Sequence, residues 1–152
     1  MQKPKFIFRL VPMPPRDFSE TLEEILHDDP RYAKNAYYFV RKALDFTVKR
    51  IAEKARRPVQ HISGGQMLEG FRIYALEEFG PMASTVLESW GLHETMDVGA
   101  LIFNLVEHGV LGKTEKDSRE DFKDVYTFVD AFEKPFLPKK KRRNGPGTKI
   151  EE

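Results

Sequence analysis

Between Pro30 and Pro58, apolar residues recur at steps of three and four, the spacing that places side chains on one face of an α-helix. The pattern predicts one amphipathic helix over 30–56, about 40 Å long at about 1.5 Å per residue. Asp29 before Pro30 is a favourable helix start, and the residue before Pro58 is biased away from helical geometry. The stripe consists of Ala33, Ala36, Tyr37, Val40, Ala43, Leu44, Thr47, Val48, Ile51 and Ala55.

Three aromatic residues of this segment, Tyr38, Phe39 and Phe46, fall outside the stripe. A helix that carries apolar groups on a second face buries that face as well. The long helix is therefore expected to contact neighbours on two sides, or a partner on one of them.

Two elements are predicted before the long helix. The run 5–11 lies between two prolines and is rich in aromatic and branched residues, which favours a short strand. Asp17 and Glu20 have the spacing of a capping box, in which each side chain accepts a backbone N–H of the first helical turn. They predict a helix that ends before Pro30.

The second half of the chain predicts several short helices. Ser63 and Gln66 have the spacing of another capping box and open a helix over 64–79. The order of elements indicates a mainly α (α+β) domain, helical with a small β-sheet and winged-helix-like in its second half. After the first helix come helices over 82–90 and 97–108, a charged loop over 113–123 and a strand over 125–129.

Composition limits the class of protein. The chain has 152 residues, 40% apolar and 32% charged, which suits one globular domain, assigned here to 1–136 with a tail over 137–152. The sequence has no cysteine, which excludes disulfides, thiolate metal sites and thiol nucleophiles. No apolar run has the length of a signal peptide or a membrane span, so we expect a cytoplasmic protein with no membrane partner.

The tail differs in charge from the rest of the chain. Residues 133–152 include seven basic and three acidic residues, a net charge of +4, which leaves −3 on the first 132 residues. Prolines and glycines interrupt the tail and few apolar residues are available to offset the entropy of ordering, so we predict disorder from about Lys139. The candidate polyanion-binding residues are Lys139, Lys140, Lys141, Arg142 and Arg143.

A winged-helix-like order also suggests a DNA-binding regulator, but the charges of this region oppose that interpretation. Between Arg72 and Lys113 there is no basic residue, whereas the same stretch has six acids. A helix in the major groove needs Lys or Arg for phosphates and residues such as Asn for base edges. The residues expected on the exposed face of the last helix, and our candidates for contact with a protein partner, are Asp97, Asn104, Glu107 and His108.

Glu107 and His108 are also the most enzyme-like pair in the chain. Adjacent residues of a helix point about 100° apart, so they cannot bind one ion through that helix alone. The four histidines show no metal-binding spacing, and no nucleophile lies in a catalytic motif. We therefore predict no metal, cofactor or catalytic residue. A small enzyme is retained as an alternative that requires Glu107 and His108 to converge in a concave pocket.

Several strings of residues resemble a known family. They are Asp29-Pro30-Arg31-Tyr32, the stretch 75–83, the stretch 98–112 with Phe103-Asn104-Leu105-Val106-Glu107-His108-Gly109, and Ser118-Arg119-Glu120-Asp121-Phe122. Over roughly 29–132 the chain resembles the Minf-type family of small bacterial proteins. The resemblance implies a bacterial source and assigns no activity, ligand or catalytic residue.

These observations favour a non-enzymatic interaction or adaptor protein. The acidic region 73–112 is expected to contact a protein, and the basic tail is expected to attach to RNA or the ribosome. Two alternatives remain: the DNA-binding regulator and the small enzyme described above. A tail that only keeps an acidic domain soluble would explain the same charges.

Overall fold

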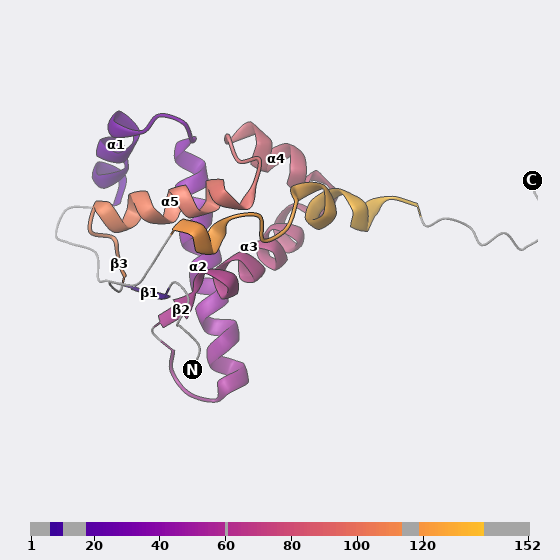
Figure 1. Ribbon diagram of the computed structural model, residues 1–152, viewed down its shortest axis with the longest axis horizontal. Coiled ribbons are helices and arrows are strands. Elements are labelled where there is room, and N and C mark those ends of the chain that lie inside the picture. Colours follow the sequence, from indigo (N-terminus) through magenta and orange to yellow (C-terminus); the bar gives the residue numbers. More distant parts are fainter. Residues whose placement is uncertain (1–6, 11–17, 60, 114–118, 139–152) are drawn as a thin grey trace, which may run out of the picture.

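The computed structural model describes residues 7–10, 18–59, 61–113 and 119–138 of the chain (Figure 1). The described part is mainly helical, as the sequence predicts. Its principal elements are β1 (Ile7–Leu10), α1 (Phe18–Asp28), α2 (Lys34–Ala55), β2 (His61–Ser63), α3 (Gly64–Phe79), α4 (Ala83–Ser89), α5 (Thr95–Glu107) and β3 (Leu111–Lys113). Short helical turns occupy Gly80–Met82, Arg119–Phe122, Val129–Glu133 and Lys134–Phe136.

The long helix α2 runs through the whole height of the molecule, with α5 and α3 crossing it (Figure 1). It begins four residues later than the sequence suggests. The Asp29 carboxylate accepts the backbone N–H of Arg31 at 3.2 Å and closes a turn, so it does not cap the helix. The end is as predicted, because Arg56 has a φ of 58° and leads the chain away from the helix axis.

The packing of α2 against α3 depends on one small residue. Gly70 of α3 faces Thr47 of α2, and both residues are buried. A Cβ atom added at Gly70 would lie 1.8 Å from Thr47 Oγ1 and 2.7 Å from Thr47 Cβ. The two helices therefore approach each other through a position where only glycine fits.

The sheet joins three distant parts of the chain. β1 lies in the middle and pairs antiparallel with both neighbours, in the order β2-β1-β3. Arg9 lies opposite His61 on one side and Gly112 on the other. The N-terminal strand thus ties the start of α3 to the end of α5, which confirms the predicted strand within 5–11 over Ile7–Leu10.

The capping signal predicted at the start of α3 is confirmed. Ser63 Oγ accepts the N–H of Gln66, whose side chain in turn accepts the N–H of Ser63, so the predicted box begins α3. Glu94 and Asp97 form a similar reciprocal box at the start of α5. Asp17, the residue proposed to cap the first helix, lies outside the described residues.

The predicted strand over 125–129 is wrong. Thr127 forms one isolated bridge with Glu94, and the chain enters a helical turn at Val129. The aromatic residues of this segment contact other parts of the fold instead of a neighbouring strand. The Phe128 and Phe132 rings lie 5.1 Å apart, and the Tyr126 hydroxyl donates to the Leu68 carbonyl of α3. Alternating aromatics therefore fill a gap beside α3 without a neighbouring strand to pair with.

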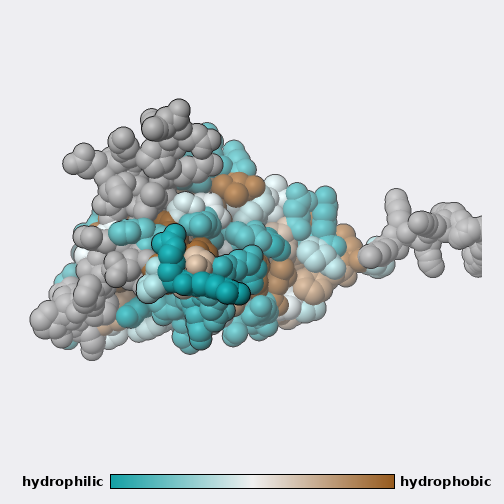
Figure 2. Space-filling model, turned by 90° about the horizontal axis from the view of Figure 1, so that it is seen from below, coloured by the Kyte–Doolittle hydropathy of each residue, from teal (hydrophilic) through white to brown (hydrophobic). Residues whose placement is uncertain are grey.

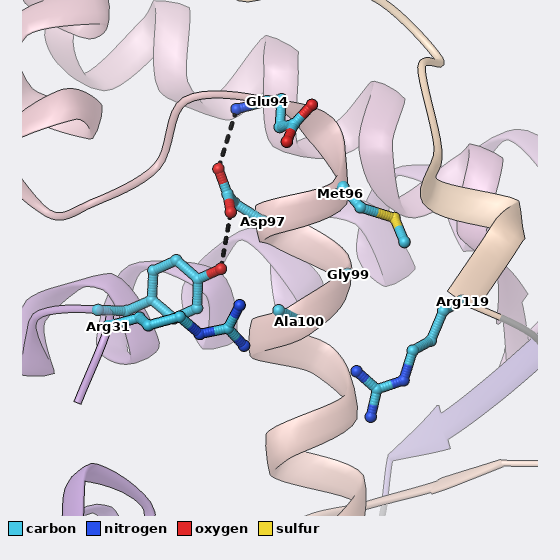
Figure 3. A pocket seen from close by; sticks show the side chains of 8 residues that line it. Arg31, Glu94, Met96, Asp97, Gly99, Ala100 and Arg119 are labelled. Carbon is cyan, nitrogen blue, oxygen red and sulfur yellow. Dashed lines mark hydrogen bonds between the residues drawn. The ribbon is translucent and has the colours of Figure 1, made fainter. Parts of the chain in front are cut away.

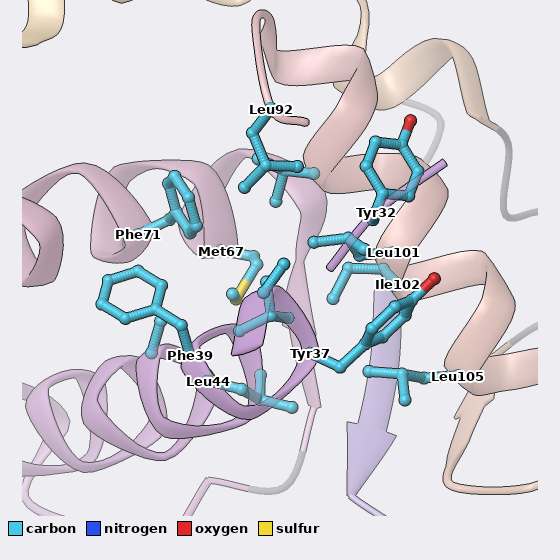
Figure 4. Packing of buried hydrophobic residues seen from close by; sticks show 14 of the residues in the cluster. Tyr32, Tyr37, Phe39, Leu44, Met67, Phe71, Leu92, Leu101, Ile102 and Leu105 are labelled. Carbon is cyan, nitrogen blue, oxygen red and sulfur yellow. The ribbon is translucent and has the colours of Figure 1, made fainter. Parts of the chain in front are cut away.

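The core lies where α2, α3 and α5 meet (Figure 4). Tyr37 from α2, Phe71 from α3 and Ile102 from α5 are completely buried there. The same cluster continues from Phe18 in α1 to Phe132 near the end of the described chain. Phe39, which falls outside the main stripe of α2, stacks with Phe79 and contacts Phe71, so the second apolar face of α2 meets α3.

Candidate functional site

The last turns of α2 extend beyond the core, at the lower end of the molecule in Figure 1. Residues 49–57 include five cations and one acid, Glu53, and all five cations are exposed. Figure 2, which looks onto this end, shows hydrophilic side chains gathered there. We call this group the α2 basic end: Lys49, Arg50, Lys54, Arg56 and Arg57.

The α2 basic end is not neutralised by ion pairs. Within the described ranges, no ion pair involves any of its five cations. Cations near a helix C-terminus offset its dipole by a fraction of a kcal/mol each, and their charge stays available to solvent. By contrast, acids of the fold neutralise Arg31, Lys34, Arg72, Arg119 and Lys134.

Sequence reasoning missed this surface. It assigned Lys49 to the polar face of an amphipathic helix, where charges are usually paired along the helix or solvated. The signal that could have found it is the density of charge, with five cations in the nine residues 49–57. The predicted polyanion-binding residues Lys139, Lys140, Lys141, Arg142 and Arg143 lie outside the described residues, so their role stays a prediction.

Asp97, predicted to face a partner, is half-buried and engaged within the fold (Figure 3). The Tyr32 hydroxyl donates to one of its carboxylate oxygens at 2.7 Å. The other oxygen accepts the backbone N–H groups of His93 and Glu94, at 2.8 and 3.1 Å. Burial, and then the hydrogen bond to Asp97, raise the pKa of Tyr32 well above its ordinary value, so this phenol stays a donor.

Asn104 is likewise half-buried and joins α5 to the segment before α2. Its amide donates to the Asp29 carboxylate and to the Tyr37 hydroxyl, both at 2.9 Å. Burial raises the pKa of Tyr37 to about 12. The Arg31 guanidinium, aided by the Asn104 amide, holds the pKa of Asp29 well below its ordinary value.

Glu107 and His108 do not converge. The His108 ring has Nδ1 2.9 Å from the Asn104 carbonyl oxygen and Nε2 3.2 Å from the Asp28 carboxylate. Glu107 is exposed and lies 3.4 Å from the Arg119 guanidinium. The geometry required by the small-enzyme alternative is therefore not formed by these two residues, and no trio of His, Asp or Glu among the described residues could hold a metal ion.

The position of α5 also bears on the DNA-binding alternative. Of the thirteen residues of α5, Glu107 alone is exposed, because α2, α3, β3 and the turn Arg119–Phe122 pack around the helix. The expectation that Asp97, Asn104 and His108 lie on an exposed face is wrong for this reason, since all three are half-buried. A recognition helix needs an accessible face to enter a groove, and α5 offers none.

No protein-family model, curated protein or solved structure matches the chain. The resemblance to the Minf-type family accordingly stays a prediction. The structure does bring several of the strings behind it together, since Asp29, Arg31, Asn104 and Arg119 lie along one side of α5. In the part of the chain that the structure describes, no helix has the length and apolarity needed to cross a membrane.

Proposed function

We propose that this is a non-enzymatic interaction protein of the bacterial cytoplasm that attaches to RNA through the α2 basic end, with the tail cations Lys139–Arg143 adding a second contact. The observation that carries the proposal is a set of five exposed cations at a helix end that extends from the core, none of them ion-paired with another residue that the structure describes. Each phosphate that meets such a cation releases counterions, which favours binding to a polyanion.

The distribution of charge over the fold supports the same proposal. The exposed acids within 73–112 lie on the end of α3, on α4 and beside α5, away from the α2 basic end in Figure 1. A polyanion is repelled there and oriented toward α2. We assign this acidic surface to a protein partner, as the sequence predicts for 73–112; its exposed acids are Glu77, Glu78, Glu88, Glu94 and Glu107.

Because α3, α4, α5 and β3 follow one another in the order typical of a winged helix, we retain the winged-helix-like fold as part of the proposal. We assign α5, its last helix, a role other than DNA recognition. Because α5 is buried, it serves as a packing element and leaves the reading of nucleic acid to other surfaces. Binding through exposed cations alone is electrostatic and carries little sequence preference.

The test is the salt dependence of binding to a short single-stranded RNA, measured by fluorescence anisotropy with the full chain. In the first variant, Arg50, Lys54 and Arg57 are replaced by Gln. We expect the slope of log affinity against log salt to become shallower by about 2, at about 0.7 per lost phosphate contact. A second variant with Gln at 139–143 measures the contribution of the tail. Its slope should become shallower by about 3.5 if all five cations meet phosphates.

The matched control replaces Lys34, Arg72 and Lys134, which lowers the net charge by the same amount at ion-paired positions. It should keep the slope of the natural chain. An unchanged slope in the α2 variant, or an equal loss in the control, contradicts the proposal. Sequence-dependent binding to duplex DNA that survives both the α2 and the tail replacements would favour the DNA-binding regulator instead.

A further inference from the structure

A small pocket lies beside α5, between the segment that bears Arg31 and the turn that begins at Arg119 (Figure 3). It encloses about 170 Å³ and its floor is formed by Met96, Gly99 and Ala100. Arg31 and Arg119 stand on either side, and their guanidinium groups point toward each other across Ala100. Two like charges are thus aimed into one space.

Close packing places these two arginines. A Cβ atom at Gly99 would lie 2.7 Å from the Phe122 ring, so the turn Arg119–Phe122 reaches the surface of α5 only because this position is glycine. On the other side, a Cβ atom at Gly91 would lie 2.6 Å from the Arg31 carbonyl oxygen. The backbone that bears each arginine is therefore held against the fold.

Each guanidinium is also held by its own partners. The Arg31 group bonds the Asp29 carboxylate through Nε at 2.9 Å and Nη2 at 2.8 Å, and lies 5.0 Å from the centroid of the Tyr32 ring. Arg119 lies 4.8 Å from the centroid of the Phe103 ring, and its Nη2 is 3.4 Å from Glu107. Such contacts reduce the entropy lost when a ligand binds.

One edge of each arginine remains open. Among the described residues, no hydrogen bond uses Nη1 of Arg31 or Nη1 of Arg119. A guanidinium has five N–H donors in a planar fork, so a carboxylate on one edge leaves donors for a second acceptor on the other.

Two acids, Asp97 and Glu94, also line the pocket. Asp97 accepts hydrogen bonds from Tyr32 and from two backbone N–H groups. Glu94 is exposed, and its backbone N–H donates to the Asp97 carboxylate at 3.1 Å. What the pocket offers to an oxyanion is therefore the open N–H donors of the two arginines, since a guanidinium paired on one edge still donates from the other.

We propose that this pocket binds a small oxyanion, a phosphate or a carboxylate group, bridged between Arg31 and Arg119 over Ala100. The volume of about 170 Å³ suits such a group with a small substituent. This site is independent of RNA attachment, because it uses neither the α2 basic end nor the tail.

The test is calorimetric titration of the full chain with inorganic phosphate and, separately, with acetate. We expect saturable binding of at least one of them. In Arg119→Gln the affinity should fall at least tenfold, because a charge-assisted hydrogen bond is lost. Ala100→Glu should abolish binding by placing a carboxylate between the arginines, and thermal unfolding monitors whether that variant folds. The relative affinities of phosphate and acetate identify the class of ligand.

The control is Arg72→Gln, a half-buried arginine that is paired with Glu69 outside the pocket. It should bind both anions as the natural chain does. Absence of saturable binding of either anion overturns the proposal. Equal affinity in Arg119→Gln and the natural chain also overturns it and assigns the binding to the α2 basic end or the tail.

Discussion

Replacing Gly70 by alanine is expected to lower the free energy of unfolding by about 3 kcal/mol, the upper part of the usual range for an overpacked core. The new Cβ atom would meet Thr47 Oγ1 at 1.8 Å and Thr47 Cβ at 2.7 Å. Rotating the threonine side chain relieves the first contact and leaves the second, because Cβ does not move with that rotation. The axes of α2 and α3 must therefore separate, and the core between them loses contacts.

Chemical denaturation of the purified chain measures this effect. Gly65→Ala is the matched control in the same helix, since a Cβ atom there meets nothing closer than Ser63 Oγ at 3.9 Å. That control should gain up to about 1 kcal/mol from helix propensity. Combining Gly70→Ala with Thr47→Gly removes the clash, so the double variant should lose less than the sum of the two single losses. Additive losses would show that the helices do not meet at this pair.

Replacing Asp29 by asparagine is expected to lower the free energy of unfolding by about 2 kcal/mol at neutral pH, the usual range for hydrogen bonds to a charged group. The carboxylate accepts two bonds from the Arg31 side chain and one from Asn104. Its side chain is 17% exposed, so the bonds are sheltered from solvent. An asparagine presents an amide N–H to at least one of these donors and leaves that donor unsatisfied.

The contribution of Asp29 to the free energy of unfolding depends on pH. Because the folded-state pKa of Asp29 lies below the ordinary value of 3.8, ionised Asp29 stabilises the fold above that value. The stabilisation is lost as pH falls below about 4, when the unfolded chain takes up the proton first. The stability difference between the natural chain and Asp29→Asn should therefore be largest near neutral pH and shrink toward pH 2.

Glu23→Gln is the control for this prediction. Glu23 pairs with Lys34 at 2.8 Å, but both side chains are exposed, so solvent screens the pair and its loss should change stability little. Urea midpoints for the three chains across the acid range provide the comparison. A difference for Asp29→Asn that stays constant between neutral pH and pH 2 would contradict the assigned role of the carboxylate.

Local signals in the sequence account for most of the helices. The apolar stripe of α2 and the capping box of Ser63 and Gln66 depend on residues that are close together in the sequence. Periodicity and capping rules therefore locate them. The predicted strand over 125–129 failed because Tyr126 and Phe128 alternate as strand residues do, whereas the structure gives them other partners. The Tyr126 hydroxyl bonds the Leu68 carbonyl on α3, and the Phe128 ring packs against Phe132. Such tertiary contacts override local propensity.

The candidate sites depend on contacts that sequence alone does not show. The sequence alone does not distinguish Arg31, Arg72 and Arg57. In the fold, Arg31 pairs with Asp29 and Arg72 pairs with Glu69, whereas Arg57 is exposed. Asn104 was expected on the exposed face of its helix, among the candidates for contact with a protein partner. The structure turns it toward Asp29 and Tyr37, residues more than sixty positions earlier in the chain.

The most direct measurement of the central claim is a titration of the full chain with single-stranded RNA, followed by amide chemical-shift changes. The account predicts the largest changes within 49–57, at the α2 basic end, with α5 unchanged. Largest changes in α5, together with an unperturbed end of α2, would contradict it.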